Sequence, residues 1–209
     1  MKIGSEQIKE IFYTFHRVMD EKEAYLVELD SVAGDGDLGL SMNDGFTAIA
    51  EMLKDKKEDD IGKLFFAIAK KMNEAASSSA GTLLSSAFMT AAKALKGNTQ
   101  IDEKGLTLMV NSWLEGIVRM GGAKRGEKTL LDALIPAAEA MQAYQGEDIK
   151  ELACLGADAA ERGAAEAKEL LAVHGKMAVK GEKSRGMQDP GAVMISILFR
   201  AMADCIAQF

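Results

Sequence analysis

The sequence predicts an all-α protein, a bundle of about seven or eight helices. Apolar residues recur at steps of three and four along most of the chain, which is the spacing of one helix face. No segment alternates apolar and polar residues well enough to predict a strand. With 209 residues and 48% hydrophobic content, the chain is long enough to bury one core, so we expect a single domain over residues 1–209.

Six periodic segments account for most of the predicted helices. In the first of them, Ile8, Ile11, Phe12, Phe15 and Val18 would form one apolar face. The segments cover residues 8–18, 46–53, 61–72, 83–95, 106–117 and, in an alanine-rich stretch, about 149–173. We expect each to pack its apolar face against the others.

Helix start signals agree with this periodicity. The pairs are Ser41 with Asp44 and Thr129 with Asp132, which have the spacing of a capping box, and Asp189 with Pro190, which has the pattern of an N-cap and a first helical residue. Pro136 lies well inside the helix that Thr129 would begin. It predicts either a kink in that helix or a later start.

Charge and cysteine content narrow the class of protein. With 25 basic and 32 acidic residues, the formal net charge of −7 disfavours a general binder of nucleic acids or anionic membranes. Cys154 and Cys205 are isolated from each other and from any histidine, so we expect buried free thiols. The N-terminus has no apolar signal core, and the apolar run 191–199 is too short to span a bilayer, so we expect a cytoplasmic protein.

One glycine-rich loop, residues 29–41, predicts a metal site. We call it the acidic loop, and its carboxylates are Asp30, Asp35 and Asp37. Hard cations such as Mg²⁺ prefer oxygen ligands and leave room for phosphate oxygens, so magnesium with phosphate is the first hypothesis. An EF-hand calcium loop would need glycine and glutamate where Leu40 and Phe46 stand. An ordinary turn without a ligand stays open as an alternative.

Three further loops have compositions suited to phosphate binding. They are the serine loop (residues 75–82), a basic loop (residues 121–129) and a long connection (residues 174–191). Helices that follow such loops present free backbone N–H groups to an anion. A plain turn and solvated surface charge remain the alternatives. Neither a P-loop nor a dinucleotide-binding glycine motif is present, so any nucleotide site must be built on helices.

Taken together, these loops resemble the nucleotide-binding L subunit of dihydroxyacetone kinase. The matching motifs occur in the same order over nearly the whole chain: Leu29-Asp30 through Gly34-Asp35-Gly36-Asp37-x-Gly39, Gly126-Glu127-Lys128-Thr129-x-x-Asp132, Gly181-Glu182-Lys183-Ser184 and Gln188-Asp189-Pro190-Gly191-Ala192. Four motifs in register are much less probable by accident than one.

The resemblance implies a barrel of eight amphipathic, mostly antiparallel helices that binds ADP or ATP at one end. It implies that two Mg²⁺ ions link the phosphates to Asp30, Asp35 and Asp37, which would be both metal ligands and catalytic residues. By the same resemblance, the phosphate contacts would be Leu38, Gly39, Leu40, Ser41, Ser79 and Ala80, the adenine pocket would contain Gly121 and Leu130, and the site would be completed by Lys176, Asp189, Pro190 and Gly191.

The resemblance also implies partners. A triose-binding kinase subunit would hold dihydroxyacetone, or a similar small hydroxyketone or sugar, while this subunit supplies the phosphate. Versions linked to the phosphotransferase system add a phosphocarrier subunit, so the phosphate donor stays open, as does a homodimer. His16 and His174 lie outside the matched catalytic motifs, so the chain should not be the covalent substrate subunit. We expect no nucleic-acid or membrane partner.

Three positions depart from the family pattern. Leu38 stands where histidine is usual, the serine loop lacks the usual glycines, and Lys176 replaces an arginine and so lacks a planar fork of donors. These changes leave open a different class of function, a non-catalytic nucleotide-sensing protein that docks on a partner.

Overall fold

Eight α-helices build the part of the chain that the structure describes, which is residues 1–209 apart from the side chain of Ala33. In this computed structural model they are α1 (Ser5–Ala33), α2 (Leu38–Lys54), α3 (Ile61–Ala75), α4 (Ser79–Ala94), α5 (Glu103–Gly121), α6 (Leu131–Ala143), α7 (Ile149–Glu166) and α8 (Pro190–Ala207). Two 3₁₀ segments, η1 (Ala167–Glu169) and η2 (Lys176–Ser184), lie between α7 and α8. The predicted all-helical class is confirmed.

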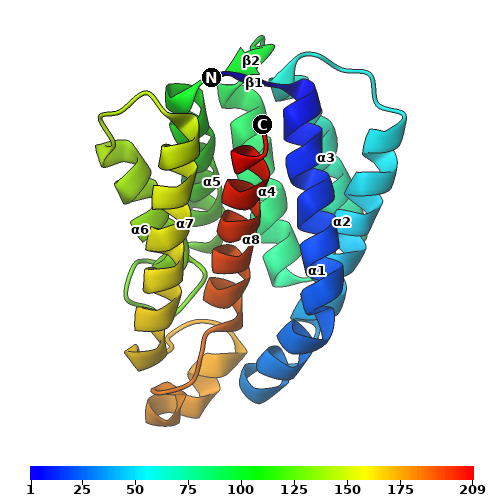
Figure 1. Cartoon of the computed structure of the whole chain (residues 1–209). Helices are drawn as coiled ribbons and strands as arrows, with labels where there is room; N and C mark the ends of the chain where they lie inside the picture. The colour runs from blue at the N-terminus through cyan, green and yellow to red at the C-terminus, as the bar shows by residue number, and fades with distance from the viewer.

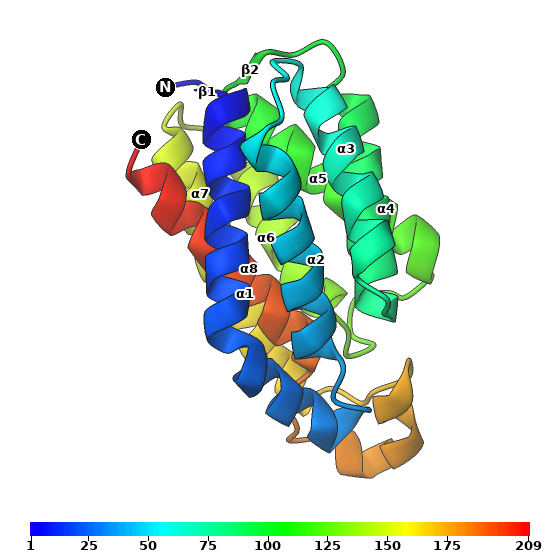
Figure 2. The same cartoon turned by 90° about the vertical axis from the view of Figure 1, so that its right-hand side faces the viewer.

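The helices alternate in direction and close into a barrel (Figures 1 and 2). Each helix packs on the next one in the sequence, and α8 packs on both α7 and α1, which closes the ring. Because the directions alternate, the acidic loop, the serine loop, the basic loop and the long connection all lie at one end. Both termini lie at the opposite end (Figure 1). We call these the loop end and the terminal end.

Aromatic side chains fill the interior of the barrel. The cluster comprises Phe12, Phe15, Phe46, Phe65, Phe88, Trp113 and Phe199, with ring centroids of contacting pairs 5.4–6.5 Å apart. Many of these contacts are edge-to-face, the favoured geometry for aromatic pairs. The cluster draws on six of the helices, so it fixes their relative positions and gives the loop end a rigid base.

A short β-pairing is an element that the sequence did not predict. Strand β1 (Ile3–Gly4) pairs antiparallel with β2 (Gln100–Ile101) at the terminal end. Two residues are too few for an alternating pattern to appear, so the prediction of no strand is wrong at this place. The pairing fastens the start of α1 to the connection before α5.

Two predicted helix starts differ from the structure. The capping box of Ser41 and Asp44 is wrong, because α2 begins at Leu38 and Ser41 lies inside its first turn. The other helix, α6, begins at Leu131 rather than directly after Thr129. One of the two capping-box bonds forms there, because Asp132 accepts from the Thr129 N–H at 2.8 Å, whereas the Thr129 hydroxyl accepts from the Leu131 N–H at 3.3 Å instead of from the Asp132 N–H.

The sequence predicted the start of one proline-containing helix but not the place of the proline in the other. Asp189 caps α8, since its carboxylate accepts the Ala192 N–H at 2.7 Å and Pro190 is the first helical residue, as predicted. Pro136 stays inside α6, so a start late enough to move it out of the helix interior does not occur.

The C-terminal region corrects two expectations. Helix α7 ends at Glu166 and passes into η1, so the helix predicted to about residue 173 is too long. Cys154 is exposed and Cys205 is only half-buried, although both are free thiols, so the expected burial is wrong for both. Cys154 lies on the outer face of α7, opposite the alanine and glycine positions that pack inward.

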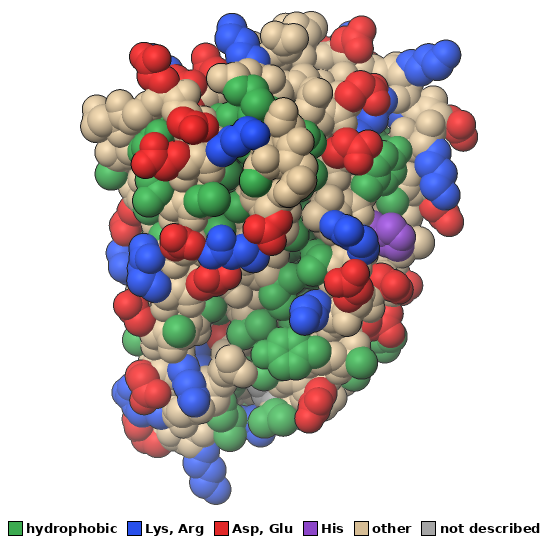
Figure 3. Space-filling view, viewed as in Figure 1, with side chains coloured by type: hydrophobic (Ala, Val, Ile, Leu, Met, Phe, Trp, Pro, Cys, Tyr) green, Lys and Arg blue, Asp and Glu red, His purple; other side chains and the backbone are tan. Residues whose placement is uncertain are grey.

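Helix α8 is long and apolar enough to cross a bilayer on length and composition, with a mean hydropathy of 1.5. Within the fold, however, 67% of it is buried, and its packing on α1 and α7 accounts for its apolar character. On the face shown in Figure 3, acidic and basic side chains are interspersed, so the net charge of −7 is not gathered there into one patch.

Candidate functional site

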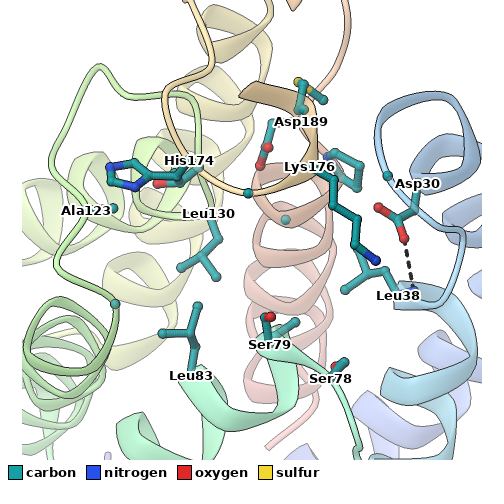
Figure 4. Close-up of a pocket in the computed structure, with 18 of the residues that line it drawn as sticks. Asp30, Leu38, Ser78, Ser79, Leu83, Ala123, Leu130, His174, Lys176 and Asp189 are labelled. Carbon is teal, nitrogen blue, oxygen red and sulfur yellow. Dashed lines mark hydrogen bonds between the residues drawn. The ribbon is translucent and has the colours of Figure 1, made fainter. Parts of the chain in front are cut away.

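A cavity of about 610 Å³ opens at the loop end of the barrel (Figure 4). Its volume lies within the range of roughly 300–1,000 Å³ that is usual for small-molecule sites. All four loops singled out from the sequence contribute to its lining. The predicted site residues that line it are Asp30, Asp35, Asp37, Leu38, Ser79, Ala80, Gly121, Leu130, Lys176, Asp189, Pro190 and Gly191.

Three predicted phosphate contacts do not line the cavity. Gly39 faces α1, where a Cβ atom would come within 2.9 Å of the Val27 backbone nitrogen. Leu40 is half exposed on the outside of α2. Ser41 is buried, and its hydroxyl bonds to the Ser78 hydroxyl at 2.9 Å. Gly39 and Ser41 therefore hold α2 against its neighbours rather than facing the cavity.

The acidic loop brings three carboxylates together at one side of the cavity. Asp30 lies in the last turn of α1, and Asp35 and Asp37 lie in the short loop before α2. One oxygen from each lies within 4.8 Å of the others. Asp30 is half-buried and accepts the Leu38 N–H at 3.3 Å, whereas the other two are exposed. A cluster of carboxylate oxygens at this spacing fits a hard divalent cation.

Two glycines allow the acidic loop to fold so tightly. A Cβ atom at Gly34 would lie 2.8 Å from Oδ1 of Asp30. Gly36 has φ of +76°, and its Cβ atom would lie 2.5 Å from the Ser31 hydroxyl. Residues with side chains rarely adopt this backbone conformation, so glycine is required at position 36 for the loop to turn between Asp35 and Asp37.

Lys176 reaches the acidic loop from the long connection. Its ammonium forms an ion pair with the Asp35 carboxylate. In Figure 4 the side chain extends across the cavity toward Leu38 and Asp30. It therefore places one positive charge between the carboxylates and the open volume, where a phosphate group would need it.

The N-terminus of α4 forms the floor of the cavity between the acidic and apolar sides. Ser78 caps this helix by accepting the Gly81 N–H at 3.1 Å, and Ser79 is the first helical residue. The remaining N–H groups of the first turn lack partners within the helix, and the helix dipole adds a partial positive charge. This geometry suits a bound anion.

Asp189 lies at the back of the cavity, where α8 begins. Burial raises the pKa of Asp189 to about 6, against the opposing effect of the Ala192 N–H. The nearby carboxylate of Asp132 raises the pKa further. The group is therefore a buried carboxylate that holds a proton more readily than an exposed one.

The other side of the cavity is apolar. Leu83 from α4 and Leu130 before α6 point toward each other, with Ala123 and His174 beside them (Figure 4). His174 is held by Glu127, whose carboxylate lies 2.6 Å from Nε2, and this hydrogen bond keeps the pKa of Glu127 below its usual value. A flat apolar ring fits such a slot better than a charged group does.

Sequence reasoning missed several residues of the lining. Leu83 follows the periodicity of α4, and that periodicity predicts a core position rather than a site residue. His174 and Lys128 lie inside loops that the sequence did single out, but neither was assigned to the site. Their position beside glycines in those loops was the available signal.

Comparison with known proteins places this geometry in a family. Residues 32–204 match the DAK2 domain. The chain is 32% identical over 188 residues to the ADP-binding subunit DhaL of a PEP-dependent dihydroxyacetone kinase from Listeria innocua, covering 90% of each chain. It is 28% identical to the corresponding subunit of Escherichia coli, covering 89% of this chain and 90% of that one.

Longer relatives contain the same domain as one part. The chain is 30% identical over 206 residues to L-erythrulose 1-kinase of Mycolicibacterium smegmatis, covering 96% of this chain but 35% of that enzyme. The dihydroxyacetone kinase of C. freundii in its native form superposes with a TM-score of 0.75 at 26% identity, over 97% of this chain and 35% of that one. A second structure of that kinase, in complex with AMP-PNP and Mg²⁺, shares the fold with a TM-score of 0.73 at 24% identity, over 98% of this chain and 34% of that one. The chain therefore belongs to the DAK2 domain family, together with the DhaL-type subunits of dihydroxyacetone kinases.

Proposed function

We propose that this chain is the magnesium-dependent, adenine-nucleotide-binding subunit of a dihydroxyacetone-type kinase. The observation that carries the proposal is the meeting of Asp30, Asp35 and Asp37 within 4.8 Å at the mouth of the cavity. The similarity over 90% of the chain to an ADP-binding subunit supports it.

The two sides of the cavity match the two halves of a nucleotide. Leu83, Leu130 and Gly121 would hold the adenine ring in the apolar slot. The first turn of α4, with Ser79 and Ala80, and the ammonium of Lys176 would contact the phosphates. The start of α8, at residues 189–191, would close the site behind them.

The acidic loop would hold the metal. Asp30, Asp35 and Asp37 would bind two Mg²⁺ ions, which when bound neutralise phosphate charge and keep the phosphate chain oriented for transfer. The chain's own contribution is then positional: its loops hold the phosphates in place and offer N–H groups and one ammonium to their charge.

The reaction would take place with a partner. A triose-binding kinase subunit would present dihydroxyacetone or a similar small hydroxyketone or sugar to the open side of the cavity. The erythrulose and dihydroxyacetone kinases that contain this domain within a longer chain support such a pairing. A phosphocarrier subunit would restore the nucleotide if the system is PEP-dependent, as the DhaL relatives are. We place the subunit in the cytoplasm.

Calorimetric titration with ADP tests the nucleotide site. The wild type should bind ADP with Mg²⁺ present and much more weakly with EDTA. Asp35→Asn should bind ADP weakly even with Mg²⁺ present, so that adding EDTA makes little further difference. Asp59→Asn makes the same chemical change at an exposed aspartate of the terminal end and should bind like the wild type. No magnesium-dependent heat from the wild type would contradict the proposal.

A transfer assay separates catalysis from sensing. Leu38, where the resemblance implies a histidine, is buried beside the acidic loop and offers no polar group, which favours a non-catalytic, nucleotide-sensing relative as the second candidate. The purified chain, ATP, Mg²⁺ and dihydroxyacetone are combined with a triose-binding subunit from a related system. Formation of dihydroxyacetone phosphate would support the kinase, and binding of nucleotide without transfer would support the sensor.

A further inference from the structure

Lys128, in the basic loop, is a fully buried lysine at the edge of the cavity. It is 1% exposed, although lysine is almost never fully buried without partners. Its φ of +56° is the one positive value at a non-glycine residue in the described chain. A side chain held in this conformation usually means that the surrounding structure requires it.

The ammonium of Lys128 is fully used by three backbone carbonyl oxygens. It donates to Lys168 O at 2.8 Å, Ser184 O at 2.8 Å and Leu170 O at 3.2 Å. An ammonium has three hydrogens to donate, so none remains for a ligand. Burial lowers the pKa of Lys128, while the carboxylates of Asp189 and Glu169 act in the opposite direction.

The three carbonyls belong to both ends of one segment. We call residues 167–189, between α7 and α8, the cap segment. Lys168 and Leu170 stand near its beginning and Ser184 near its end, so one ammonium bridges two ends that are also joined directly by the Gly186 N–H donating to Lys168 O at 2.8 Å. His174 and Lys176, which face the cavity, lie between them.

Other contacts to the cap segment are weaker or more exposed. The Val173 N–H donates to Glu127 O at 3.3 Å, and the pair of Glu127 and His174 is partly exposed to solvent. Within the segment, Ser184 Oγ accepts the Ala172 N–H at 3.0 Å. Lys128 is therefore the buried connection between the basic loop and the cap segment, with charge-assisted bonds that are stronger than neutral ones.

We propose that Lys128 is a positioning residue that holds the cap segment in place at the wall of the cavity before nucleotide binds. Through it, the loop beside the adenine slot fixes where Lys176 meets the phosphates. The proposal rests on the proposed nucleotide site for its consequence, but the hold on the cap segment exists in the free protein.

Hydrogen–deuterium exchange of the nucleotide-free protein tests this role directly. In Lys128→Met, amides of residues 168–186 should exchange at least about tenfold faster, while those of α1 to α5 stay unchanged. Lys168→Met is the matched control, because it removes an exposed ammonium from the same segment and leaves its carbonyl in place. The control should exchange like the wild type. Unchanged exchange in Lys128→Met would overturn the proposal.

Binding of Mg–ADP gives the second readout. Lys128→Met should raise the Kd about tenfold to hundredfold, since nucleotide must then also order the cap segment. Loss of affinity with unchanged exchange would overturn the proposal and indicate a direct phosphate contact. If the wild type binds no Mg–ADP, the proposed function fails, whereas the exchange result still decides the role of Lys128.

Two measurements guard against a variant that does not fold. Lys128→Gln keeps an N–H₂ group and should show a smaller increase in exchange. In the wild type labelled with ¹⁵N-lysine, one ammonium signal should exchange its hydrogens with water much more slowly than exposed lysines do. The absence of any such protected signal would overturn the proposal without a substitution.

Discussion

The two ends of the barrel use the same residue type in different ways. At the terminal end, aspartates before helices cap them: Asp60 accepts the Lys63 N–H at 3.1 Å, and Asp102 accepts the Gly105 N–H at 3.1 Å. At the loop end, Asp37 occupies the N-cap position of α2 but makes no capping bond with its side chain. Without a capping bond, the Asp37 carboxylate does not add the stability that a helix cap would give the fold. It stays free beside Asp30 and Asp35.

The pKa values of the two capping aspartates at the terminal end reflect their bonds to backbone N–H groups. The Gly105 N–H holds the pKa of Asp102 below its usual value, against the effect of burial. Burial acts to raise the pKa of Asp60, but the N–H groups of Lys63 and Gly97 outweigh it and lower the value. These two carboxylates are therefore committed to the backbone, so they are poor candidates for a ligand site.

Replacing one aspartate at each end by alanine should give the largest contrast between affinity and stability. Asp37→Ala should weaken Mg–ADP binding by about a thousandfold, roughly 4 kcal/mol, because a metal ligand is lost. Its unfolding free energy should change by less than about 0.5 kcal/mol, since no cap is removed. Titration calorimetry and urea denaturation measure the two quantities.

The matching substitution at the other end should do the reverse. Asp102→Ala should cost about 1 kcal/mol of unfolding free energy through the lost cap and leave the Kd for Mg–ADP unchanged. If both variants lost stability to the same degree and neither lost affinity, the division between the two ends would be wrong.

The fold could be predicted from the sequence because its signal is local. In each helix, apolar residues recur every three or four positions. A helix such as Ile61 to Met72 or Leu106 to Ile117 can therefore be predicted from its own residues, without reference to the rest of the chain. The start of α2 could not, because Ser41 and Asp37 are equally good cap types. The left-handed turn at Gly36, which decides between them, lies against α1, where a Cβ atom would come within 2.5 Å of the Ser31 hydroxyl.

The candidate site could be predicted only in part for the same reason. The acidic loop is continuous in sequence, so its three aspartates could be read together. The bonds of Lys128 join residues 40, 42 and 56 positions apart, and no local pattern encodes them. Leu83 likewise faces Leu130 across the cavity only because α4 and the basic loop meet in the fold.

Asp189 is a helix cap at the loop end. Unlike the capping aspartates of the terminal end, it is buried, and its pKa is raised instead of lowered. Its pKa of about 6 lies above the value near 3.9 of an unfolded chain, so between these values the folded state binds more protons. The unfolding free energy of the metal-free protein should therefore fall as the pH rises from about 4 to 6, by up to about 3 kcal/mol.

Asp189→Asn should remove this dependence while keeping the cap, since asparagine caps helices as well as aspartate does. The variant should be more stable than the wild type at pH 7 and no more stable at pH 3.5. Denaturation curves in EDTA across this range measure it. Parallel curves for the two proteins would show that the carboxyl is not penalised by burial.

Gly36→Ala should weaken Mg–ADP binding less than Asp37→Ala does, at a modest cost in stability. The Cβ atom would meet the Ser31 hydroxyl at 2.5 Å in a backbone conformation that alanine adopts at a cost of about 1 kcal/mol. Relief of that strain would move Asp35 and Asp37 apart, so affinity for Mg–ADP should fall more than tenfold for a small change in unfolding free energy. Gly97→Ala has a positive φ of 87° at the terminal end, in open space, and should lose similar stability with no loss of affinity. If the two variants bound Mg–ADP equally well, backbone strain at the loop end would affect affinity no more than strain at the terminal end does. The turn at Gly36 would then serve only to connect α1 with α2.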